Sequence, residues 1–123
     1  MHEASLAQGL LKIALASLEE HAQKNPGGKA LKIKEIVCDA GLFAGFEDSA
    51  LRACLELFAE GTPCEDAILT INTLPLDCRC QTCGKSFQAE KRRFSCPHCG
   101  GEEVDFSGGR GLTLKAINVD TED

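Results

Sequence analysis

Two Cys-x-x-Cys pairs, Cys80 with Cys83 and Cys96 with Cys99, are separated by twelve residues. Two such pairs at this separation bring four thiolates to one point, which is the arrangement that a tetrahedral metal ion needs. A glycine follows each pair, and glycine permits the positive φ that such a tight turn requires. The spacing therefore predicts a metal site with four cysteine ligands.

The sequence also bears on the identity of the ion and of its first ligand. Cys78 is a rival to Cys80, but the symmetry of the two pairs favours Cys80. Four thiolates suit zinc or iron, and the second pair is similar to those of rubredoxins. Rubredoxins pack their iron in aromatic residues, whereas only Phe87, Phe94 and Phe106 are near this site in the sequence. We therefore expect a closed, structural Zn(II) site that folds its own loop.

The opening residues Met1, His2 and Glu3 could bind a second metal ion. The α-amine, the amide nitrogen of His2 and its imidazole Nδ1 form fused chelate rings. A further amide or the Glu3 carboxylate can complete a square of nitrogen and oxygen donors. Such a square suits Ni(II) and Cu(II) rather than zinc. An ordinary terminus that binds no metal is the alternative that this pattern alone leaves open.

The composition indicates a folded chain with few aromatic residues. Its 123 residues, 43% of them hydrophobic, fit one ordinary domain or a small domain with an insert. No stretch approaches the roughly 20 apolar residues of a membrane span, and His2 and Glu3 follow Met1 at once, which is not the basic and apolar pattern expected of a secretory leader. We therefore expect a cytoplasmic protein without membrane contacts. In that reducing compartment Cys38, Cys54 and Cys64 should be free, buried thiols.

Hydrophobic spacing predicts the order helix, strand, helix, strand, metal insert, strand. The expected elements span 5–24, 29–38, 47–60, 64–72 and 112–119. Two helices should pack on a small sheet of about three strands, which makes an α+β fold with an inserted four-Cys zinc-ribbon module. Pro75 and the glycine-rich run 108–111 bound the insert. We therefore expect one domain of residues 1–75 and 109–123, and a zinc-binding module of residues 76–108.

Two finer expectations concern the first helix and the first strand. Ser5 and Gln8 fit a capping box at the start of the helix. In the strand, Leu31, Ile33 and Val37 should share the buried face. The helix should bury a wide apolar face made of Leu6, Leu10, Leu11, Ile13, Leu15, Leu18 and Ala22.

Taken together, these motifs resemble the HypA/HybF family of nickel metallochaperones in hydrogenase maturation. The resemblance rests on the opening Met-His-Glu, the two-helix body, the cysteine insert with Cys78 before it, and the final strand followed by acidic residues. It covers nearly the whole chain. It implies Ni(II) at His2 with N-terminal backbone nitrogens, and Zn(II) in the four-Cys module. It further implies delivery of nickel to the [NiFe]-hydrogenase large subunit with a HypB-type GTPase, and in some bacteria to urease through an accessory protein.

One alternative is a zinc-ribbon adaptor that binds nucleic acid or protein. Its basic residues would be Lys91, Arg92 and Arg93, beside Phe94. The charge distribution disfavours nucleic acid, because the net charge is −6 and residues 77–106 hold five basic and five acidic side chains. The rest of the chain holds eight basic and fourteen acidic residues. This excess of acidic residues would repel phosphate.

Another alternative is a redox enzyme that uses Cys-x-x-Cys chemistry. Such enzymes need one exposed dithiol with a lowered pKa, not two paired turns that each end in glycine. The chain has no glycine-rich phosphate loop, no Ser/His/Asp set and only three histidines. We therefore expect no enzymatic activity.

Overall fold

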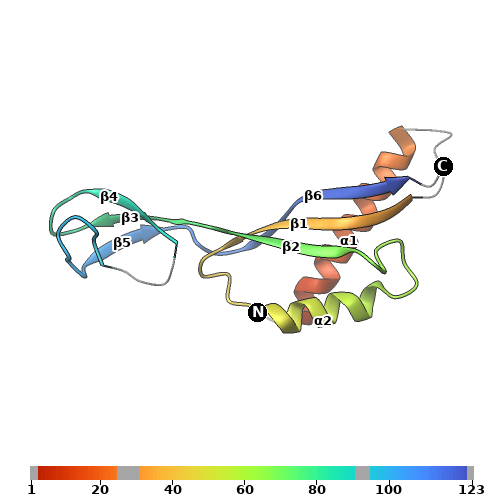
Figure 1. The fold of residues 1–123 in the computed structure, drawn as a ribbon, viewed down its shortest axis with the longest axis horizontal. Coiled ribbons are helices and arrows are strands. Elements are labelled where there is room, and N and C mark those ends of the chain that lie inside the picture. Colours follow the sequence, from red (N-terminus) through yellow and green to blue (C-terminus); the bar gives the residue numbers. More distant parts are fainter. Residues whose placement is uncertain (1–2, 25–30, 91–94, 122–123) are drawn as a thin grey trace. The chain divides into compact units, whose positions relative to one another are not determined.

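The computed structural model describes residues 3–24, 31–90 and 95–121 (Figure 1). The strands described form two three-stranded sheets, ordered β2-β1-β6 and β4-β3-β5. The predicted α+β fold with a small sheet and an inserted cysteine module is therefore confirmed. Within the described part of the chain, no helix has the length and apolar character needed to cross a membrane. The elements are α1 (Glu3–Lys24), β1 (Leu31–Gly41), α2 (Asp48–Ala59), β2 (Ile68–Leu74), β3 (Leu76–Cys80), β4 (Ser86–Ala89), β5 (Val104–Ser107) and β6 (Leu112–Thr121).

The chain divides into two compact units. The first, called the body unit below, comprises Met1–Cys38, Gly45–Ile71 and Leu114–Asp123. The second, called the cysteine unit, comprises Asp39–Ala44 and Asn72–Thr113.

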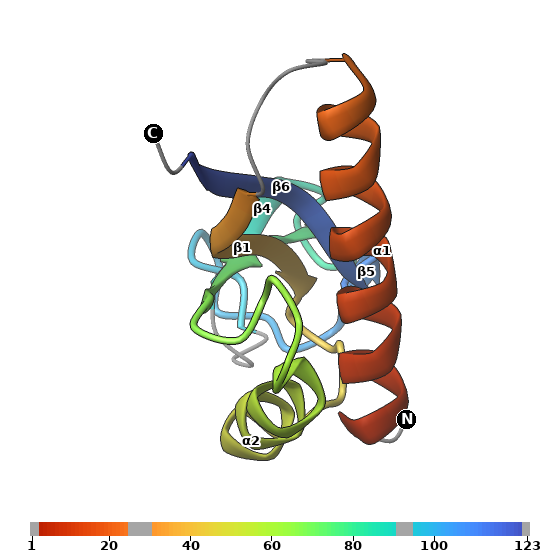
Figure 2. The same cartoon turned by 90° about the vertical axis from the view of Figure 1, so that its right-hand side faces the viewer.

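In the body unit, α1 and α2 pack against each other, and Figure 2 shows α2 near the N-terminal end of α1. The other end of α1 lies beside β6, because Ser17 and His21 line a shared pocket with Ile117 and Val119. Burial of apolar side chains between these elements stabilises the unit. Its buried core consists of Ala7, Leu10, Ala14, Leu18, Ile33, Ile36, Cys38, Leu51, Leu55, Ala59, Cys64 and Leu69.

The capping box predicted for the first helix is wrong. The helix already begins at Glu3, so Ser5 lies inside it and cannot be its N-cap. The predicted apolar face is confirmed at Leu10 and Leu18 but is narrower than predicted, because Ile13 is 51% exposed and Ala22 is exposed. The buried residues form a narrow stripe at helical spacing, and its two alanines are the least exposed of them. This stripe consists of Ala7, Leu10, Ala14 and Leu18.

The prediction for the buried face of β1 is confirmed at Ile33 and wrong at Val37, and the side chain of Leu31 lies outside what the structure describes. Ile33 is buried, but Val37 is half-buried while Ile36 and Cys38 on either side of it are buried. Because successive side chains of a strand point to opposite faces, Val37 lies on the face opposite to Ile36 and Cys38. Strand β2 begins at Ile68, later than predicted, because residues 62–67 form tight turns closed by backbone hydrogen bonds.

Helix α2 has a well-formed start. The carboxylate of Glu47, its N-cap, accepts hydrogen bonds from the backbone N–H groups of Ser49 and Ala50. These bonds satisfy donors that an α-helix leaves free in its first turn. Leu51, Leu55 and Ala59 are buried, so the helix lies with its apolar stripe toward the core.

In the cysteine unit, β3 is the central strand and pairs antiparallel with β4 and β5. Its residues alternate strictly, because Leu76, Cys78 and Cys80 are buried and the two residues between them are exposed. Leu76 and Cys78 form a small core with Ala89. This core anchors the strand that delivers Cys80 to the metal site. The side chains that pack around this small core are Leu42, Phe43, Phe87 and Val104.

Candidate metal centre

Two turns of the same construction carry the four cysteines of the predicted site. In the first turn, the N–H of Gly84 donates to the carbonyl of Cys80 at 2.9 Å, and in the second the N–H of Gly100 donates to the carbonyl of Cys96 at 2.8 Å. Both glycines adopt positive φ, 75° and 77°, where a side chain would strain the backbone. The Cys-x-x-Cys-Gly sequence therefore folds locally into a turn that directs two sulfurs to one side.

Backbone hydrogen bonds tie the first turn to the segments that lead into the strands beside it. The N–H of Cys80 donates to the carbonyl of Lys85 at 3.0 Å, which ties the first turn to the approach to β4. The N–H of Gln81 donates to the carbonyl of Glu103 at 2.9 Å, which ties the same turn to the residues that lead into β5. The sheet therefore positions one turn opposite the other.

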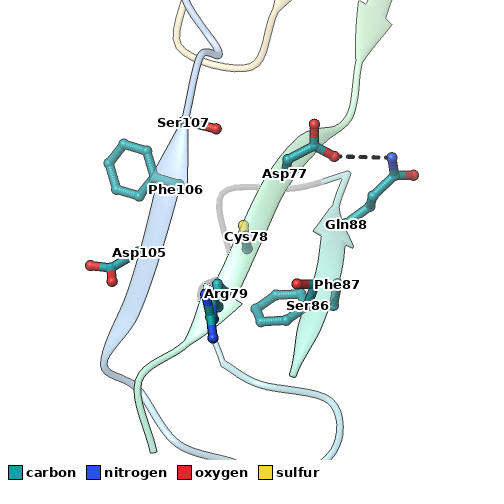
Figure 3. Close-up of a pocket in the computed structure, with 9 residues that line it drawn as sticks. All are labelled: Asp77, Cys78, Arg79, Ser86, Phe87, Gln88, Asp105, Phe106 and Ser107. Carbon is teal, nitrogen blue, oxygen red and sulfur yellow. Dashed lines mark hydrogen bonds between the residues drawn. The ribbon is translucent and has the colours of Figure 1, made fainter. Parts of the chain in front are cut away.

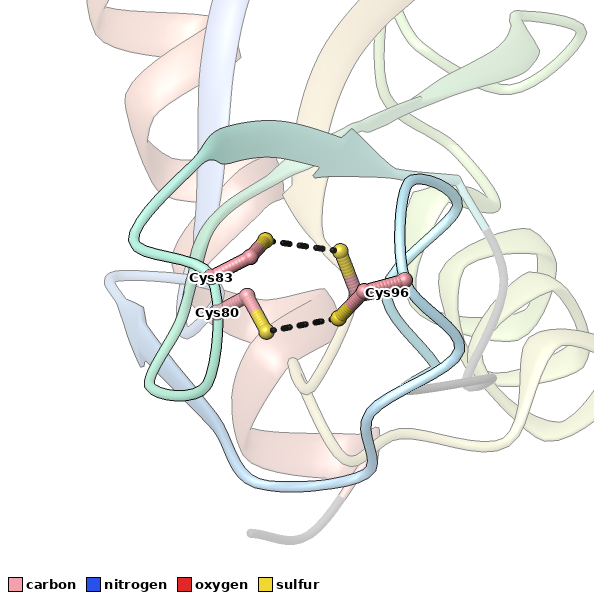
Figure 4. A group of neighbouring side chains, drawn as sticks. Cys80, Cys83 and Cys96 are labelled. Carbon is pink, nitrogen blue, oxygen red and sulfur yellow. Dashed lines mark hydrogen bonds between the residues drawn. The ribbon is translucent and has the colours of Figure 1, made fainter.

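The sulfurs of all four predicted ligands converge. Those of Cys80, Cys83, Cys96 and Cys99 lie within 4.8 Å of one another, and Figure 4 shows Cys80 and Cys83 facing the turn that carries Cys96. The Cys80–Cys99 and Cys83–Cys96 sulfur distances are 3.5 Å and 3.7 Å. Four sulfurs at about 2.3 Å from a tetrahedral zinc lie about 3.8 Å apart. The residues present therefore fit Zn(II).

Backbone N–H groups favour the thiolate form of the cysteines. The N–H of His98 donates to the sulfur of Cys96, and the N–H of Gly101 to that of Cys99, both at 3.4 Å. The backbone N–H of Cys83 is the main cause that lowers the pKa of Cys80 to about 6. Stabilisation of the charged form in this way prepares the sulfurs to bind a cation.

The fourth thiol shows why these sulfurs need a metal ion to ionise together. The N–H of Gly101 favours the Cys99 thiolate, yet its neighbours Cys80, Cys83 and Cys96, together with burial, raise the pKa of Cys99 to about 12. The hydrogen bonds with these neighbouring sulfurs favour the neutral thiol of Cys99 over its thiolate. A bound divalent cation would instead favour the thiolate form of all four sulfurs, which is the role of zinc in a closed four-thiolate site.

Cys78 lies outside this cluster. Its thiol donates to the carbonyl of Leu76 at 3.5 Å and packs beside Ala89, and burial raises its pKa. The geometry thus groups Cys80, not Cys78, with the other three sulfurs. Of the remaining cysteines, Cys38 and Cys64 are buried and Cys54 is half-buried.

The predicted nickel ligands are only partly within the described structure. Met1 and His2 lie outside the described residues, whereas Glu3 is the first residue of α1 and is half-buried. The basic run of the adaptor alternative, Lys91 to Phe94, also lies outside the described residues.

The structure also shows a surface pocket that the sequence did not predict. It has a volume of about 510 Å³ and lies on the sheet of the cysteine unit, where residues from β3, β4 and β5 meet (Figure 3). Within it, the side-chain N–H of Gln88 donates to Asp77 at 3.1 Å. No sequence pattern could have indicated it, because its residues come from three separate short strands. Its lining residues are Asp77, Cys78, Arg79, Ser86, Phe87, Gln88, Asp105, Phe106 and Ser107.

Known proteins share both the sequence and the fold. A family model described as HypA, hydrogenase/urease nickel incorporation, metallochaperone, matches residues 1–119. The hydrogenase maturation factor HypA of Dehalococcoides mccartyi is 30% identical over 122 residues, which cover 99% of this chain and 97% of that protein. The hydrogenase maturation factor HypA of Desulfitobacterium hafniense is 34% identical over 120 residues, which cover 98% of this chain and 99% of that protein. The solution structure of the Ni metallochaperone HypA from Helicobacter pylori, 28% identical, aligns with a TM-score of 0.56 over 99% of this chain and 100% of that one.

Proposed function

The chain belongs to the HypA family of hydrogenase and urease nickel-incorporation metallochaperones, and we propose that it takes up Ni(II) at its amino terminus and delivers it for [NiFe]-hydrogenase maturation. The match of the family model over residues 1–119 carries this proposal, because it includes both the opening Met-His-Glu and the four-Cys site. A family of maturation factors supplies a metal ion to another protein rather than performing catalysis. We accordingly assign the chain no enzymatic activity.

The proposed nickel ligands are Met1, His2 and Glu3. The α-amine of Met1 and the amide and imidazole nitrogens of His2 would form fused chelate rings, and a further amide or the Glu3 carboxylate would complete the square. The position of Glu3 at the start of α1 supports this proposal. Because the helix is anchored in the core through Ala7 and Leu10, the chelating residues would extend from a fixed point. An exposed terminal site can also release its ion, which delivery requires.

The two metals would serve different parts of the chain. We assign nickel binding to the domain of residues 1–75 and 109–123, and zinc binding to the module of residues 76–108. Zinc would be held by Cys80, Cys83, Cys96 and Cys99, whose convergence supports a structural site of the closed type. It would fix the two turns, and nickel would be the cargo.

The proposed partners follow from the family's role. They are a HypB-type GTPase, the [NiFe]-hydrogenase large subunit and, where urease is served, a urease accessory protein. The names of the relatives, hydrogenase maturation factors, support partners within that machinery. The acidic body disfavours nucleic acid as a partner. We place the protein in the cytoplasm, where the hydrogenase large subunit would receive its nickel.

The test is a Ni(II) titration of the untagged, zinc-loaded chain by calorimetry and absorption spectroscopy. We expect one equivalent of nickel with a diamagnetic, square-planar spectrum. The substitution His2→Ala should abolish this binding and leave the zinc content unchanged. His21→Ala, which removes an exposed imidazole near the far end of α1, is the matched control and should bind nickel normally.

Two results would contradict the proposal. Nickel affinity that survives His2→Ala would move the site away from the terminus. A chain that binds no nickel specifically would favour the zinc-ribbon adaptor, and its protein partner would then be the next question.

A further inference from the structure

A groove of about 340 Å³ runs along α2 in the body unit. One wall is a face of the helix that includes Arg52, Leu55, Glu56 and Ala59, and the other wall is the segment 64–69 that leads into β2. The helical wall covers about two turns, or roughly 10 Å. The groove is therefore long enough to receive one or two side chains of a binding partner.

The floor of the groove is apolar. Leu55, Ala59, Cys64 and Leu69 line it and are each buried. Burial raises the pKa of the Cys64 thiol, as expected for a group removed from water. At the edge, Ile68, the first residue of β2, is 67% exposed. The aliphatic part of a partner's side chain could be buried along this floor.

The rim of the groove is acidic. Glu56, Glu65 and Asp66 are exposed there. The ion pairs found among the described residues include none of these three carboxylates. Glu65 accepts a hydrogen bond from the backbone N–H of Gly61 at 3.1 Å, which leaves its charge in place. The rim thus carries negative charge that no described basic side chain pairs with.

Arg52, the basic residue that lines the groove, already forms an ion pair and a hydrogen bond within the protein. Arg52 pairs through its Nε with Asp48 at 2.8 Å, and its guanidinium also donates to the backbone carbonyl of Leu69. The bond to Leu69 ties α2 to β2, and the two bonds together hold the guanidinium at one end of the groove. The remaining length therefore combines an apolar floor with unpaired carboxylates.

We propose that this groove docks a segment of the GTPase partner that presents a lysine or arginine beside an aliphatic side chain. Lysine and arginine bury an apolar stem while their charged head stays at the surface, which matches a buried floor below an acidic rim. The neighbouring aliphatic side chain would cover Ile68. Charge complementarity of this kind speeds encounter and selects the partner. The inference rests on the proposed function, because that function supplies the partner.

The test measures binding of the purified HypB-type GTPase from the same organism to the full, zinc-loaded chain. The groove variant combines Glu56→Lys and Asp66→Lys. The control variant combines Glu19→Lys on α1 and Asp120→Lys on β6, which are exposed positions of the body unit outside the groove. Both variants have the same net charge, so general electrostatic attraction is matched between them. Thermal unfolding and nickel titration check that each variant is folded and loaded.

We expect the groove variant to weaken binding of the GTPase by about tenfold or more, and the control variant to weaken it far less. Equal weakening in both variants would show that only overall charge matters, and unchanged binding in the groove variant would place the interface elsewhere. Either result overturns the groove and leaves the proposed function standing. If the unsubstituted chain binds nickel but not the GTPase, both the groove and that partner are wrong, while the nickel site is retained.

Discussion

Gly41 and Gly109 meet backbone to backbone, so closely that a Cβ on Gly41 would overlap the carbonyl of Gly109. Two hydrogen bonds accompany this approach. The N–H of Phe43 donates to the carbonyl of Gly109, and the N–H of Gly41 donates to that of Gly111 at 3.0 Å. Within the cysteine unit, segment 39–44 is thereby fixed against the glycine run that follows β5.

The substitution Gly41→Ala should destabilise the cysteine unit by about 1–3 kcal/mol, because the added methyl group must push two backbone segments apart. Gly9→Ala is the control: nothing lies within 4 Å of a Cβ at that position. Because Gly9 is inside α1, alanine there should stabilise by about 0.5–1 kcal/mol. Urea unfolding followed by NMR signals from each unit measures both effects. A Gly41→Ala chain as stable as the parent would show that the close approach is unimportant.

The zinc site makes a second prediction. Cys83→Ala should release zinc and unfold the two turns, since three thiolates leave the tetrahedral site incomplete. Helices α1 and α2 should persist, because their mutual packing lies in the body unit. Zinc content by a chelating dye and helix content by circular dichroism measure the two effects. Collapse of both helices in this variant would show that the two units fold together.

Cys78→Ala is the matched control for the zinc prediction. It removes a buried thiol from the same unit but not from the four-sulfur cluster. The variant should therefore retain one equivalent of zinc, although the lost packing beside Leu76 and Ala89 should lower its stability. Loss of zinc on this substitution would make Cys78 a ligand.

The cysteine turns were predictable because their structure is local. Five consecutive residues, such as those from Cys80 to Gly84, contain the ligands, the closing hydrogen bond and the glycine with positive φ. The sheet β4-β3-β5 is different. Cys78 pairs with Phe87 on one side and with Phe106 on the other, and no short window of sequence shows which distant segments will pair.

The faces of the elements were predicted less well than the elements themselves. Ala7 and Ala14 are the least exposed residues described in α1, although a pattern weighted by side-chain size points to Ile13. The groove along α2 combines helix residues with segment 64–69, so its acidic rim appears only once tertiary packing brings both together. The nickel ligands were proposed from chelate chemistry and resemblance, and they still await the titration.

Glu35 supplies the third prediction. On the central strand β1, its carboxylate accepts hydrogen bonds from the hydroxyl of Thr70 on β2 and from the side-chain amide of Asn118 on β6. The bond from Thr70 is the main cause that lowers the pKa of Glu35 below its ordinary value of 4.5, and the bond from Asn118 adds to it. The ionised carboxylate thus links all three strands of the sheet.

Because the folded state holds the pKa of Glu35 below 4.5, its contribution to stability is present above that pH and is lost as the pH falls through the folded value. Glu35→Gln should therefore lower the melting temperature at neutral pH, and the difference from the parent should shrink below pH 4.5. Glu19→Gln, at an exposed position on α1, should change little at either pH. Thermal unfolding of the parent and of both variants, from neutral pH to below pH 4.5, measures these differences in melting temperature. A difference that stays constant with pH would mean that Glu35 contributes through packing rather than through its charge.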